Sequence, residues 1–325
     1  MNVTTDNLMS KILITGGAGF IGANLVRFLI PRGDVIRVLD NLSTGRAQDL
    51  DGLPLELIRG DILDPEMVNE AVAGMDIVIH LAAHTGVVES SLDPLTDMQI
   101  NVTGTLNLLQ AAVRHRISRF LFASTGGAIV GNVAPPVHEE MMPRPISPYG
   151  AGKLAGEGYC SAFWGSYNLK AVALRFSNVY GPYSYHKGSV IPKFFRQIQR
   201  RRELTVYGDG EQTRDFLYVV DLCQAISTAL EADLPWGQAI QLGTGEETTI
   251  NSLVRLLRGV VGEVQFPEVV YAPPRPGEVA RNFVSIDKAR RFLCFHPQTL
   301  LAEGLQGTWK WFCHGKRSEA ADGGR

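Results

Sequence analysis

Short apolar runs alternate with amphipathic helical patterns along the first half of the chain. Runs of strand length occupy residues 11–15, 35–39, 55–59, 76–81, 118–124 and 170–176. Helical spacing of apolar positions is found at 66–73, 95–115 and 149–167. Buried strands that alternate with helices are typical of parallel sheets covered on both faces. The pattern therefore predicts an α/β fold of the Rossmann type, with a doubly wound parallel sheet.

After about residue 180 the alternation is lost, and glycine and proline become more frequent. Short strands are predicted at 204–207, 239–242 and 268–271. Helices are predicted at 190–201, 219–231 and 249–261. We interpret residues 11–180 as a Rossmann domain to which later segments return, and residues 181–314 as a smaller α/β substrate lobe. The polar ends, 1–10 and 315–325, are expected to be disordered tails.

A glycine-rich turn joins the first predicted strand to the first predicted helix. Residues 12–22 read ILITGGAGFIG and lead directly into an amphipathic segment. A helix start presents unpaired backbone N–H groups and the positive end of the helix dipole, which together favour a phosphate. Gly16 permits the tight turn, Gly19 lets the backbone approach a pyrophosphate, and Gly22 lets the helix pack closely. An ordinary glycine-rich surface loop is the alternative interpretation.

Asp40 follows the second predicted strand, at the same edge of the sheet as the turn. A carboxylate at this place can accept hydrogen bonds from both hydroxyls of an adenosine ribose, and it repels a 2′-phosphate. The sequence therefore favours NAD over NADP as cofactor. Two observations weaken this interpretation: Asp40 could simply cap a helix, and the nearby Arg46 could accommodate a 2′-phosphate.

Composition and charge narrow the class of partners. The 325 residues are 45% hydrophobic and 20% charged, with 31 basic side chains against 33 acidic ones. The net charge of −2 predicts no basic surface for nucleic acid or an anionic membrane. No apolar stretch has the length of a bilayer span and no signal-peptide pattern is found, so we expect a cytoplasmic protein. The four cysteines lack CxxC spacing, which argues against a metal site or a disulfide framework.

Tyr149 and Lys153 are four residues apart on a predicted helix, so both side chains lie on one helix face. A nearby ammonium group stabilises a phenolate, and we expect Lys153 to lower the pKa of Tyr149 toward neutrality. Tyr149 could then remove a proton from a sugar or alcohol hydroxyl, while Lys153 could also hold a nicotinamide ribose. The alternative is a solvated helix face without chemistry.

Small hydroxyl side chains follow another strand that ends at the same edge. Ser124 and Thr125 close the strand at 118–124, and either hydroxyl could bind a reacting substrate oxygen. A Ser/Thr turn or helix cap is the structural alternative. We interpret His80, at the end of a further strand, as a structural histidine and not as a base.

Seven motifs occur in order and together resemble the extended short-chain dehydrogenase/reductases, within them the UDP-glucose (UDP-galactose) 4-epimerases. The likeness covers about residues 11–310. The motifs are Gly16–Gly22, Asp40–Gly45, Asp61-Ile62, His80–Ala83, Asn101–Thr105, Tyr149-x-x-x-Lys153 and Asn178–Pro182.

The resemblance implies a role for each matching residue. Cofactor binding is implied for Gly16, Gly19, Phe20, Ile21, Gly22, Asp40, Asn41, Ser43, Thr44, Gly45, Asp61, Ile62, Leu81, Ala82, Ala83, Asn101, Tyr149 and Lys153. Catalysis is implied for Tyr149, Lys153, Ser124 and Thr125. Binding of the UDP-sugar is implied for Asn178, Val190, Tyr207, Arg214, Arg275, Glu278 and Asn282. Two arginines from separate loops can hold a diphosphate through charge-assisted bonds, although Arg214 could instead pair with Asp215.

The chain departs from the family pattern in informative places. The hydroxyl loop lacks its usual aromatic residue and is one residue longer, so the choice between Ser124 and Thr125 stays open. Thr85 stands where some epimerases have a lysine near the cofactor. Related 4,6-dehydratases carry an acid pair, and decarboxylases a glutamate, where this chain has Gly126-Gly127. Without a second acid or base, elimination of water is disfavoured.

The expected activity is therefore an isomerase reaction: NAD-dependent epimerisation of UDP-hexoses at C4 through a transient 4-keto sugar. Asn282 replaces a large aromatic residue, which predicts room for the N-acetylated sugars. UDP-glucuronate is a further candidate, because His186 and Lys187 could meet its carboxylate. Another nucleotide-sugar-modifying activity and a non-catalytic NAD sensor are alternatives. The resemblance also implies a homodimer through helices 95–115 and 149–167.

Overall fold

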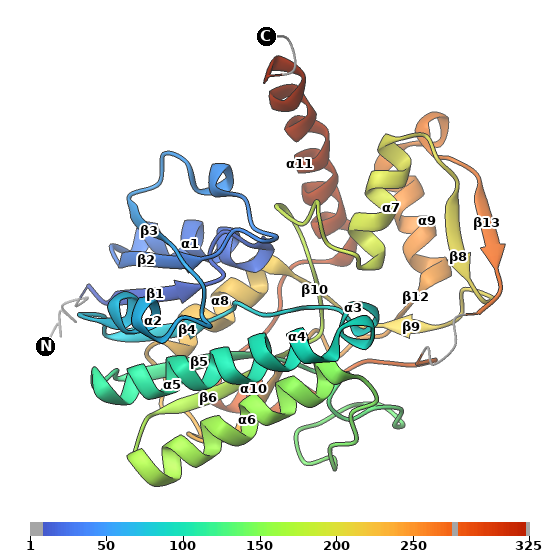
Figure 1. Cartoon of the computed structure of the whole chain (residues 1–325). Helices are drawn as coiled ribbons and strands as arrows, with labels where there is room; N and C mark the ends of the chain where they lie inside the picture. The colour runs from blue at the N-terminus through green and yellow to red at the C-terminus, as the bar shows by residue number, and fades with distance from the viewer. Residues whose placement is uncertain (1–8, 275–278, 323–325) are drawn as a thin grey trace, which may run out of the picture.

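A seven-stranded parallel sheet forms the centre of the computed structural model, which describes residues 9–274 and 279–322 (Figure 1). The strand order is β11-β6-β5-β4-β1-β2-β3, and every neighbouring pair is parallel. The strands are β1 (Lys11–Thr15), β2 (Val35–Asp40), β3 (Leu55–Arg59), β4 (Ile77–His80), β5 (Arg119–Thr125), β6 (Ala171–Phe176) and β11 (Ala239–Leu242). The predicted Rossmann-type sheet is confirmed, and β11 is a late segment that returns to it.

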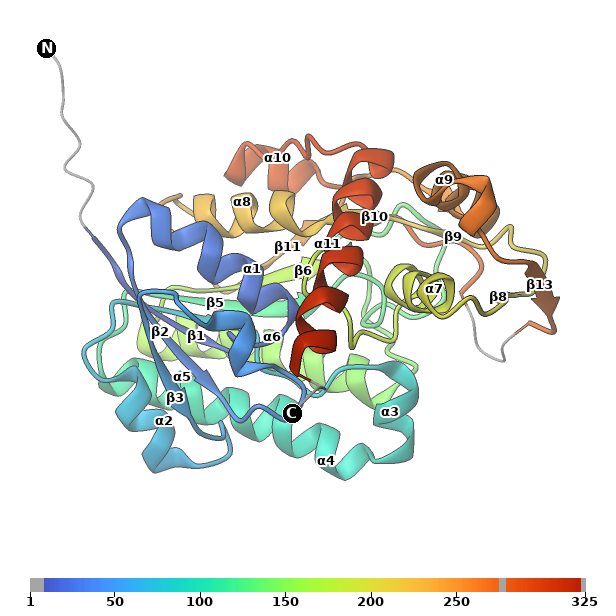
Figure 2. The same ribbon diagram turned by 90° about the horizontal axis from the view of Figure 1, so that it is seen from above.

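Helices cover both faces of this sheet (Figure 2). One face carries α1 (Phe20–Leu29), α8 (Val219–Ala229) and α10 (Asp287–Leu293). The other carries α2 (Pro65–Val72), α5 (Gly104–Arg114) and α6 (Pro148–Tyr167). Side chains of a strand alternate between faces, so Ile12 and Ile14 join the core beneath α1 while Leu13 joins the core beneath α5. Two hydrophobic layers therefore hold the sheet from both sides.

The register of the strands brings their carboxyl ends to one level. Thr15, the last residue of β1, lies beside Leu39 of β2 and beside His80 of β4. Each strand is followed by a turn or loop at this edge, where open parallel sheets bind ligands. The edge therefore positions the candidate site.

The long helix predicted at 95–115 is broken into three parts. Helix α4 (Pro94–Met98) is followed by a π-helical turn at Gln99–Thr103 and then by α5. Asn101 lies in this π-helical turn and is buried. Its side-chain amide donates to the carbonyl oxygen of His84 at 2.9 Å. Single π-turns inside helices are frequent at functional sites. The apolar spacing predicted the helix but carried no signal for this turn.

The C-terminal part forms a smaller body beside the sheet, around a core that includes Phe194, Phe195 and Phe312 (Figure 1). Its helices are α7 (Val190–Gln199), α9 (Ile250–Val261) and α11 (Leu301–Asp322). Two-stranded pairs join β7 (Asn178–Tyr180) to β10 (Phe216–Tyr218), β8 (Leu204–Tyr207) to β13 (Val269–Ala272), and β9 (Thr213–Arg214) to β12 (Thr248–Thr249). A short α3 (Val87–Leu92) and 3₁₀ turns at Ile30–Arg32, Ala47–Leu50 and Glu263–Gln265 complete the elements.

The two predicted tails lie partly outside the described residues, which leave out 1–8 and 323–325. The disorder expected for residues 1–10 and 315–325 stays a prediction. Helix α11 continues to Asp322. The end of this helix contains alanine, glutamate, lysine and arginine, which favour helix, and extending an existing helix costs less than starting one.

Candidate active site

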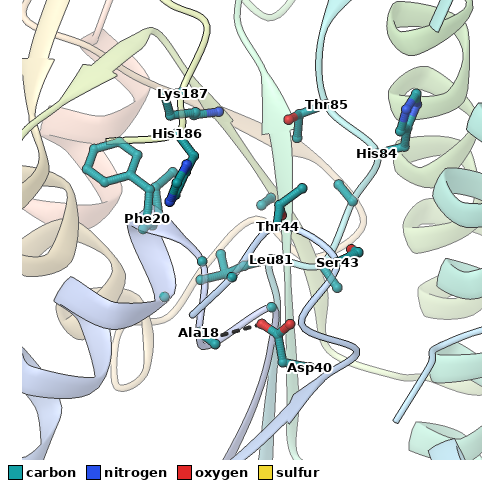
Figure 3. A pocket seen from close by; sticks show the side chains of 18 of the residues that line it. Ala18, Phe20, Asp40, Ser43, Thr44, Leu81, His84, Thr85, His186 and Lys187 are labelled. Carbon is teal, nitrogen blue, oxygen red and sulfur yellow. Dashed lines mark hydrogen bonds between the residues drawn. The ribbon is translucent and has the colours of Figure 1, made fainter. Parts of the chain in front are cut away.

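A cavity of about 910 Å³ opens at the carboxyl edge of the large sheet. Figure 3 shows side chains from well-separated segments around it, with Phe20, His186 and Lys187 on one side and His84 and Thr85 on the other. Of the residues singled out in the sequence, it is lined by Gly16, Gly19, Phe20, Ile21, Gly22, Asp40, Asn41, Ser43, Thr44, Gly45, Asp61, Ile62, Leu81, Ala82, Ala83, Ser124, Thr125, Tyr149, Lys153 and Asn178.

The glycine-rich turn has the close packing that its glycines predict. Gly16 has a φ of +70°, and a Cβ added there would lie 2.6 Å from the backbone nitrogen of Ala82. A Cβ on Gly22 would lie 2.3 Å from the Gly16 carbonyl oxygen. Helix α1 begins at Phe20, immediately after the turn, so its first N–H groups face the cavity edge. The backbone there can bind a phosphate without any side chain.

Asp40 lies beside the turn and is 8% exposed. Its carboxylate accepts hydrogen bonds from the backbone N–H of Ala18 at 3.0 Å (Figure 3) and of Leu42 at 2.8 Å. Burial raises the pKa of this carboxyl, and the two backbone bonds act in the opposite direction. Each carboxylate oxygen has a second lone pair, so Asp40 can still accept from a ligand hydroxyl.

The loop after Asp40 folds back over the turn. The backbone N–H of Arg46 donates to the Ala18 carbonyl oxygen at 3.1 Å, and a Cβ on Gly45 would lie 2.7 Å from the Ala18 carbonyl carbon. Asn41 donates to the Asp61 carboxylate at 2.9 Å. The segments 40–46 and 61–62, far apart in the sequence, therefore form one wall of the cavity.

His80 is buried and fully bonded, in agreement with a structural role. The Thr105 hydroxyl donates to the Asn101 carbonyl oxygen at 2.7 Å, so it accepts from His80 Nε2 at 3.0 Å. The Thr15 hydroxyl is then the donor to Nδ1 at 2.7 Å. Burial, and next the charge of Lys153, hold the pKa of His80 well below its usual value. The neutral ring links β1, β4 and α5.

Tyr149 and Lys153 both line the cavity from the start of α6. The Ser147 hydroxyl caps this helix by accepting from the Gly150 N–H at 3.1 Å. Lys153 is 3% exposed, and its ammonium donates to the Ala123 carbonyl oxygen at 2.9 Å. The helix therefore fixes both side chains at the carboxyl end of β5.

The expected lowering of the Tyr149 pKa is wrong for the chain by itself. Burial and then the Asp97 charge raise this pKa to about 12, against a hydrogen bond from Thr125 that lowers it. Burial lowers the Lys153 pKa to about 8, while Asp97 raises it. Desolvation of the phenol outweighs any help from the ammonium group, which is directed at a backbone carbonyl.

The two candidate hydroxyls have different partners. Ser124 is 4% exposed and donates to Glu157 at 2.6 Å, away from the phenol. Glu157 is also held by Arg175 through two bonds of 2.8 and 2.7 Å. Thr125 lies close enough to Tyr149 to lower the pKa of the phenol. Of the two alternatives left open by the sequence, Thr125 is the one beside the phenol.

Several predicted residues lie outside the cavity lining. Asn101 is buried below it, and its amide also donates to Asp97 at 2.9 Å. The residues in the C-terminal part are Val190 at the start of α7, Tyr207 at the end of β8, Arg214 on β9 and Asn282. Arg214 donates to the carbonyl oxygens of Thr213 and Val279 at 2.7 and 2.8 Å. Arg275 and Glu278 lie outside the described residues.

Sequence reasoning missed three ionisable side chains in or next to the cavity. His84 and Glu89 line the cavity, and Asp97 is completely buried next to it. The one available signal was an acidic residue four positions before Asn101, on the same face of the predicted helix. His84 and Glu89 come from a loop and a short helix without a recognisable pattern.

Metal binding and membrane insertion find no support in the described part of the chain. Within residues 9–274 and 279–322, no three His, Cys, Asp or Glu side chains are arranged to hold a metal ion. Among the helices of these residues, none has the length and apolar character that crossing a bilayer requires.

Curated relatives match the chain over nearly its whole length. A putative UDP-glucose 4-epimerase of Methanocaldococcus jannaschii is 36% identical, over 94% of this chain and 100% of that protein. A dTDP-glucose 4,6-dehydratase of Streptomyces niveus is 34% identical, over 93% of this chain and 92% of that protein.

Solved structures are similar to the same extent. The UDP-glucose 4-epimerase of Thermotoga maritima, with UDP-glucose, has a TM-score of 0.89 and 37% identity, covering 94% of this chain and 99% of that chain. The UDP-N-acetylglucosamine 4-epimerase of Methanobrevibacter ruminantium, with UDP-N-acetylmuramic acid, has a TM-score of 0.88 and 33% identity over 94% and 99%. The UDP-glucuronic acid 4-epimerase of Bacillus cereus, with NAD and a fluorinated substrate analogue, has a TM-score of 0.86 and 29% identity over 94% and 99%.

The model of one protein family matches residues 12–243, which include the glycine-rich turn, Asp40, Tyr149 and Lys153. This match agrees with the parallel sheet and with the cavity at its carboxyl edge. The chain therefore belongs to the NAD-dependent epimerase/dehydratase family.

Proposed function

We propose that the chain is a UDP-hexose 4-epimerase. One observation carries the proposal: a single cavity is lined both by the glycine-rich turn with Asp40 and by Tyr149, Lys153 and Thr125. The first group suits a dinucleotide, and the second suits proton transfer at an alcohol carbon. Epimerisation at C4 needs these two functions and no additional acid or base.

The residues around the turn fit NAD. The space above Gly16 and Gly22 is so tight that a Cβ would collide with neighbouring backbone, as a turn that supports a pyrophosphate requires. Asp40 would accept from the adenosine ribose, and we assign the adenine to the wall formed by Asn41 and Asp61. The glycine-rich turn and Asp40 would hold NAD, which would supply reversible hydride transfer at the sugar C4.

Tyr149 removes the proton of the C4 hydroxyl and later returns it, while the Thr125 hydroxyl holds the sugar oxygen. Lys153 binds the nicotinamide ribose and adds positive charge beside the phenol. A pKa of about 12 is too high for a base at neutral pH, so ionisation needs further positive charge, which the nicotinamide ring brings. Asn178 and Arg214, with Arg275, hold the UDP moiety, so that the sugar can turn over without leaving.

The residues at positions 126 and 127 support epimerisation over dehydration. Gly126 and Gly127 carry no acid, whereas the 4,6-dehydratases that the chain resembles have an acid pair there. Their nearest side-chain neighbours, Gln241 Oε1 at 2.9 Å and Asn282 Nδ2 at 2.3 Å from an added Cβ, belong to neutral amides. The site therefore favours oxidation and reduction at C4 without loss of water.

A UDP-glucuronate 4-epimerase is the second candidate. His186 and Lys187 line the cavity, and Figure 3 shows the Lys187 ammonium directed into it. Burial lowers the pKa of Lys187, and the nearby Glu89 charge raises it. A buried ammonium group is stabilised by a second anion, and a sugar carboxylate would be such a partner.

Asn282, in turn, supports acceptance of N-acetylated sugars, because its side chain is smaller than an aromatic one.

The test is a panel of UDP-sugars followed by NMR of the products, without added NAD. We expect UDP-galactose to give UDP-glucose, because the cofactor is regenerated in each cycle. The acetylated and uronic sugars rank the substrate alternatives, and dTDP-glucose tests dehydration. A requirement for stoichiometric NAD, or loss of water from the sugar, would contradict the proposal.

The non-catalytic NAD sensor is separated from the enzyme by Tyr149→Phe. We expect this variant to lose turnover by about 10²- to 10⁴-fold, because general acid–base catalysis has that magnitude, and to retain NAD. NAD released by denaturing the purified protein measures retention. An unchanged rate would remove Tyr149 from the mechanism and would favour the sensor.

A further inference from the structure

We propose that the buried carboxylate of Asp97 is a positioning group that holds Lys153 in its charged form beside Tyr149. This inference rests on the proposed function, in which Tyr149 and Lys153 carry out the proton transfer. Asp97 belongs to none of the recognised motifs, and it is buried next to the cavity without lining it.

Asp97 packs against α6, the helix that carries Tyr149 and Lys153. Its side chain is 0% exposed, and Oδ1 accepts from Asn101 at 2.9 Å and contacts His84 Nδ1 at 3.0 Å. Oδ2 is buried without a hydrogen-bond partner among the described residues. A Cβ added to Gly152 would lie 3.2 Å from this oxygen. Because Gly152 precedes Lys153 on α6, the free oxygen lies against the first turns of the helix that carries Tyr149 and Lys153.

A buried carboxylate in this position lowers the stability of the fold, so we look for a role other than packing. Burying an ionised group with an unpartnered oxygen destabilises a fold. None of the ion pairs found in the described residues joins Asp97 to a lysine or arginine, and the Asn101 amide is neutral. Glu157, the other acid near Lys153, is already neutralised by the two bonds from Arg175. Asp97 is therefore the acid whose charge acts most strongly on Lys153.

The surroundings of Lys153 show why this charge matters. The titratable groups that act on Lys153 or respond to it are Asp97, Lys187, Glu157, Cys160 and His80, with Glu89 behind Lys187. Burial lowers the pKa of Lys153 to about 8, Lys187 lowers it further, and Asp97 is the largest influence that raises it. At neutral pH Lys153 is therefore protonated, but its pKa lies only a little higher than the pH. Loss of the Asp97 charge would lower this pKa further.

The same charge acts on the phenol, in the same direction. Asp97 raises the pKa of Tyr149. Replacing the carboxylate by a neutral group therefore lowers the pKa of both partners. A base that ionises at lower pH moves the acidic limb of the activity profile down, and an ammonium that deprotonates at lower pH moves the alkaline limb down.

Asp97→Asn tests this inference with little change of shape. We expect both limbs of the kcat/KM profile to move to lower pH by about one unit, the size of effect that a nearby buried charge has. In parallel, ¹³C-labelled lysine, with the Lys153 signal assigned from Lys153→Met, should titrate at lower pH in Asp97→Asn than in the wild type. This second measurement does not depend on activity.

Asp93→Asn is the matched control. Asp93 is an exposed residue at the start of α4, the helix that carries Asp97, and it accepts from the Thr96 N–H at 3.1 Å. The identical substitution there should leave the pH profile of kcat/KM and the Lys153 titration unchanged. If Asp97→Asn does not fold, Asp97→Ser removes the same charge and should show the same shift. Superimposable profiles with a uniform loss of rate would overturn the inference and leave Asp97 a structural residue. Wild-type protein without epimerase activity would refute the proposed function instead, while the NMR titration would still decide the role of Asp97.

Discussion

Two adjacent hydroxyl side chains at the end of β5 act on different residues of α6. Ser124 donates to Glu157, and Thr125 lies close enough to Tyr149 to lower the pKa of the phenol. Neighbouring side chains leave a strand in different directions, so the two hydroxyls meet different partners. The sequence could predict that one hydroxyl serves the site. It could not predict which, since the answer depends on the register of β5 against α6.

Substitution of the two hydroxyls separates catalysis from stability. We expect Thr125→Val, which keeps the shape, to lower kcat by roughly 10- to 100-fold, because it removes a hydrogen bond to the reacting oxygen. Ser124→Ala should leave kcat within about twofold and destabilise the fold by about 1–2 kcal/mol, since a buried hydrogen bond to a charged group is lost. Steady-state rates and urea unfolding measure both, and the reverse pattern would identify Ser124 as the active hydroxyl.

At the scale of elements, the glycines of two helices have opposite roles. In α1, a Cβ on Gly22 would meet the Gly16 carbonyl oxygen at 2.3 Å. In α6, a Cβ on Gly158 would find no atom within 4 Å. The motif spacing predicted the first role correctly, because the close approach of helix and turn is a local property.

Gly22→Ala and Gly158→Ala should therefore change the protein in opposite directions. The first forces α1 away from the turn, so we expect at least a tenfold loss of NAD affinity together with a lower melting temperature. The second removes a helix-disfavouring residue from an exposed site and should stabilise the protein by up to about 1 kcal/mol. Thermal unfolding and NAD titration provide the comparison, and equal behaviour of the two variants would show that the packing of α1 does not matter.

At the scale of the whole molecule, the buried Lys153 makes stability depend on pH. Its pKa is about 8 in the folded chain and 10.5 in its ordinary state. Between these values the unfolded chain binds the additional proton, so wild-type stability rises with pH across this window. The cost of burying the ammonium is fully present below pH 8 and disappears above 10.5.

Lys153→Met removes this cost at every pH. The free energy of unfolding of the variant minus that of the wild type should therefore fall by about 3 kcal/mol between pH 8 and 10.5. Chemical denaturation of both proteins over this range measures the difference, in which the other titrating groups largely cancel. A difference that is independent of pH would show that Lys153 is not desolvated.

The outer surface of α3 and α4 carries exposed apolar side chains that would suit a dimer interface. Val88, Leu92 and Leu95 are 64%, 82% and 61% exposed, beside the helices that the resemblance assigns to a dimer. We expect light scattering to give the mass of two chains, and Leu95→Glu to give one, because a charge in an apolar interface is costly. A single-chain mass for the wild type at micromolar concentration would exclude the dimer.

The sequence by itself determined the alternation of strands and helices, the glycine-rich turn, Asp40 at the end of β2, and the position of Tyr149 and Lys153 one turn apart on a helix. Each of these depends on periodicity, on turn chemistry or on residues a few positions apart.

Only the tertiary structure decided the π-turn at Gln99–Thr103, the choice of Thr125, the raised pKa of Tyr149 and the place of Asp97 under α6. These features arise where segments distant in sequence meet, and burial there sets the cost of each charge. A linear pattern of residue types does not contain that information.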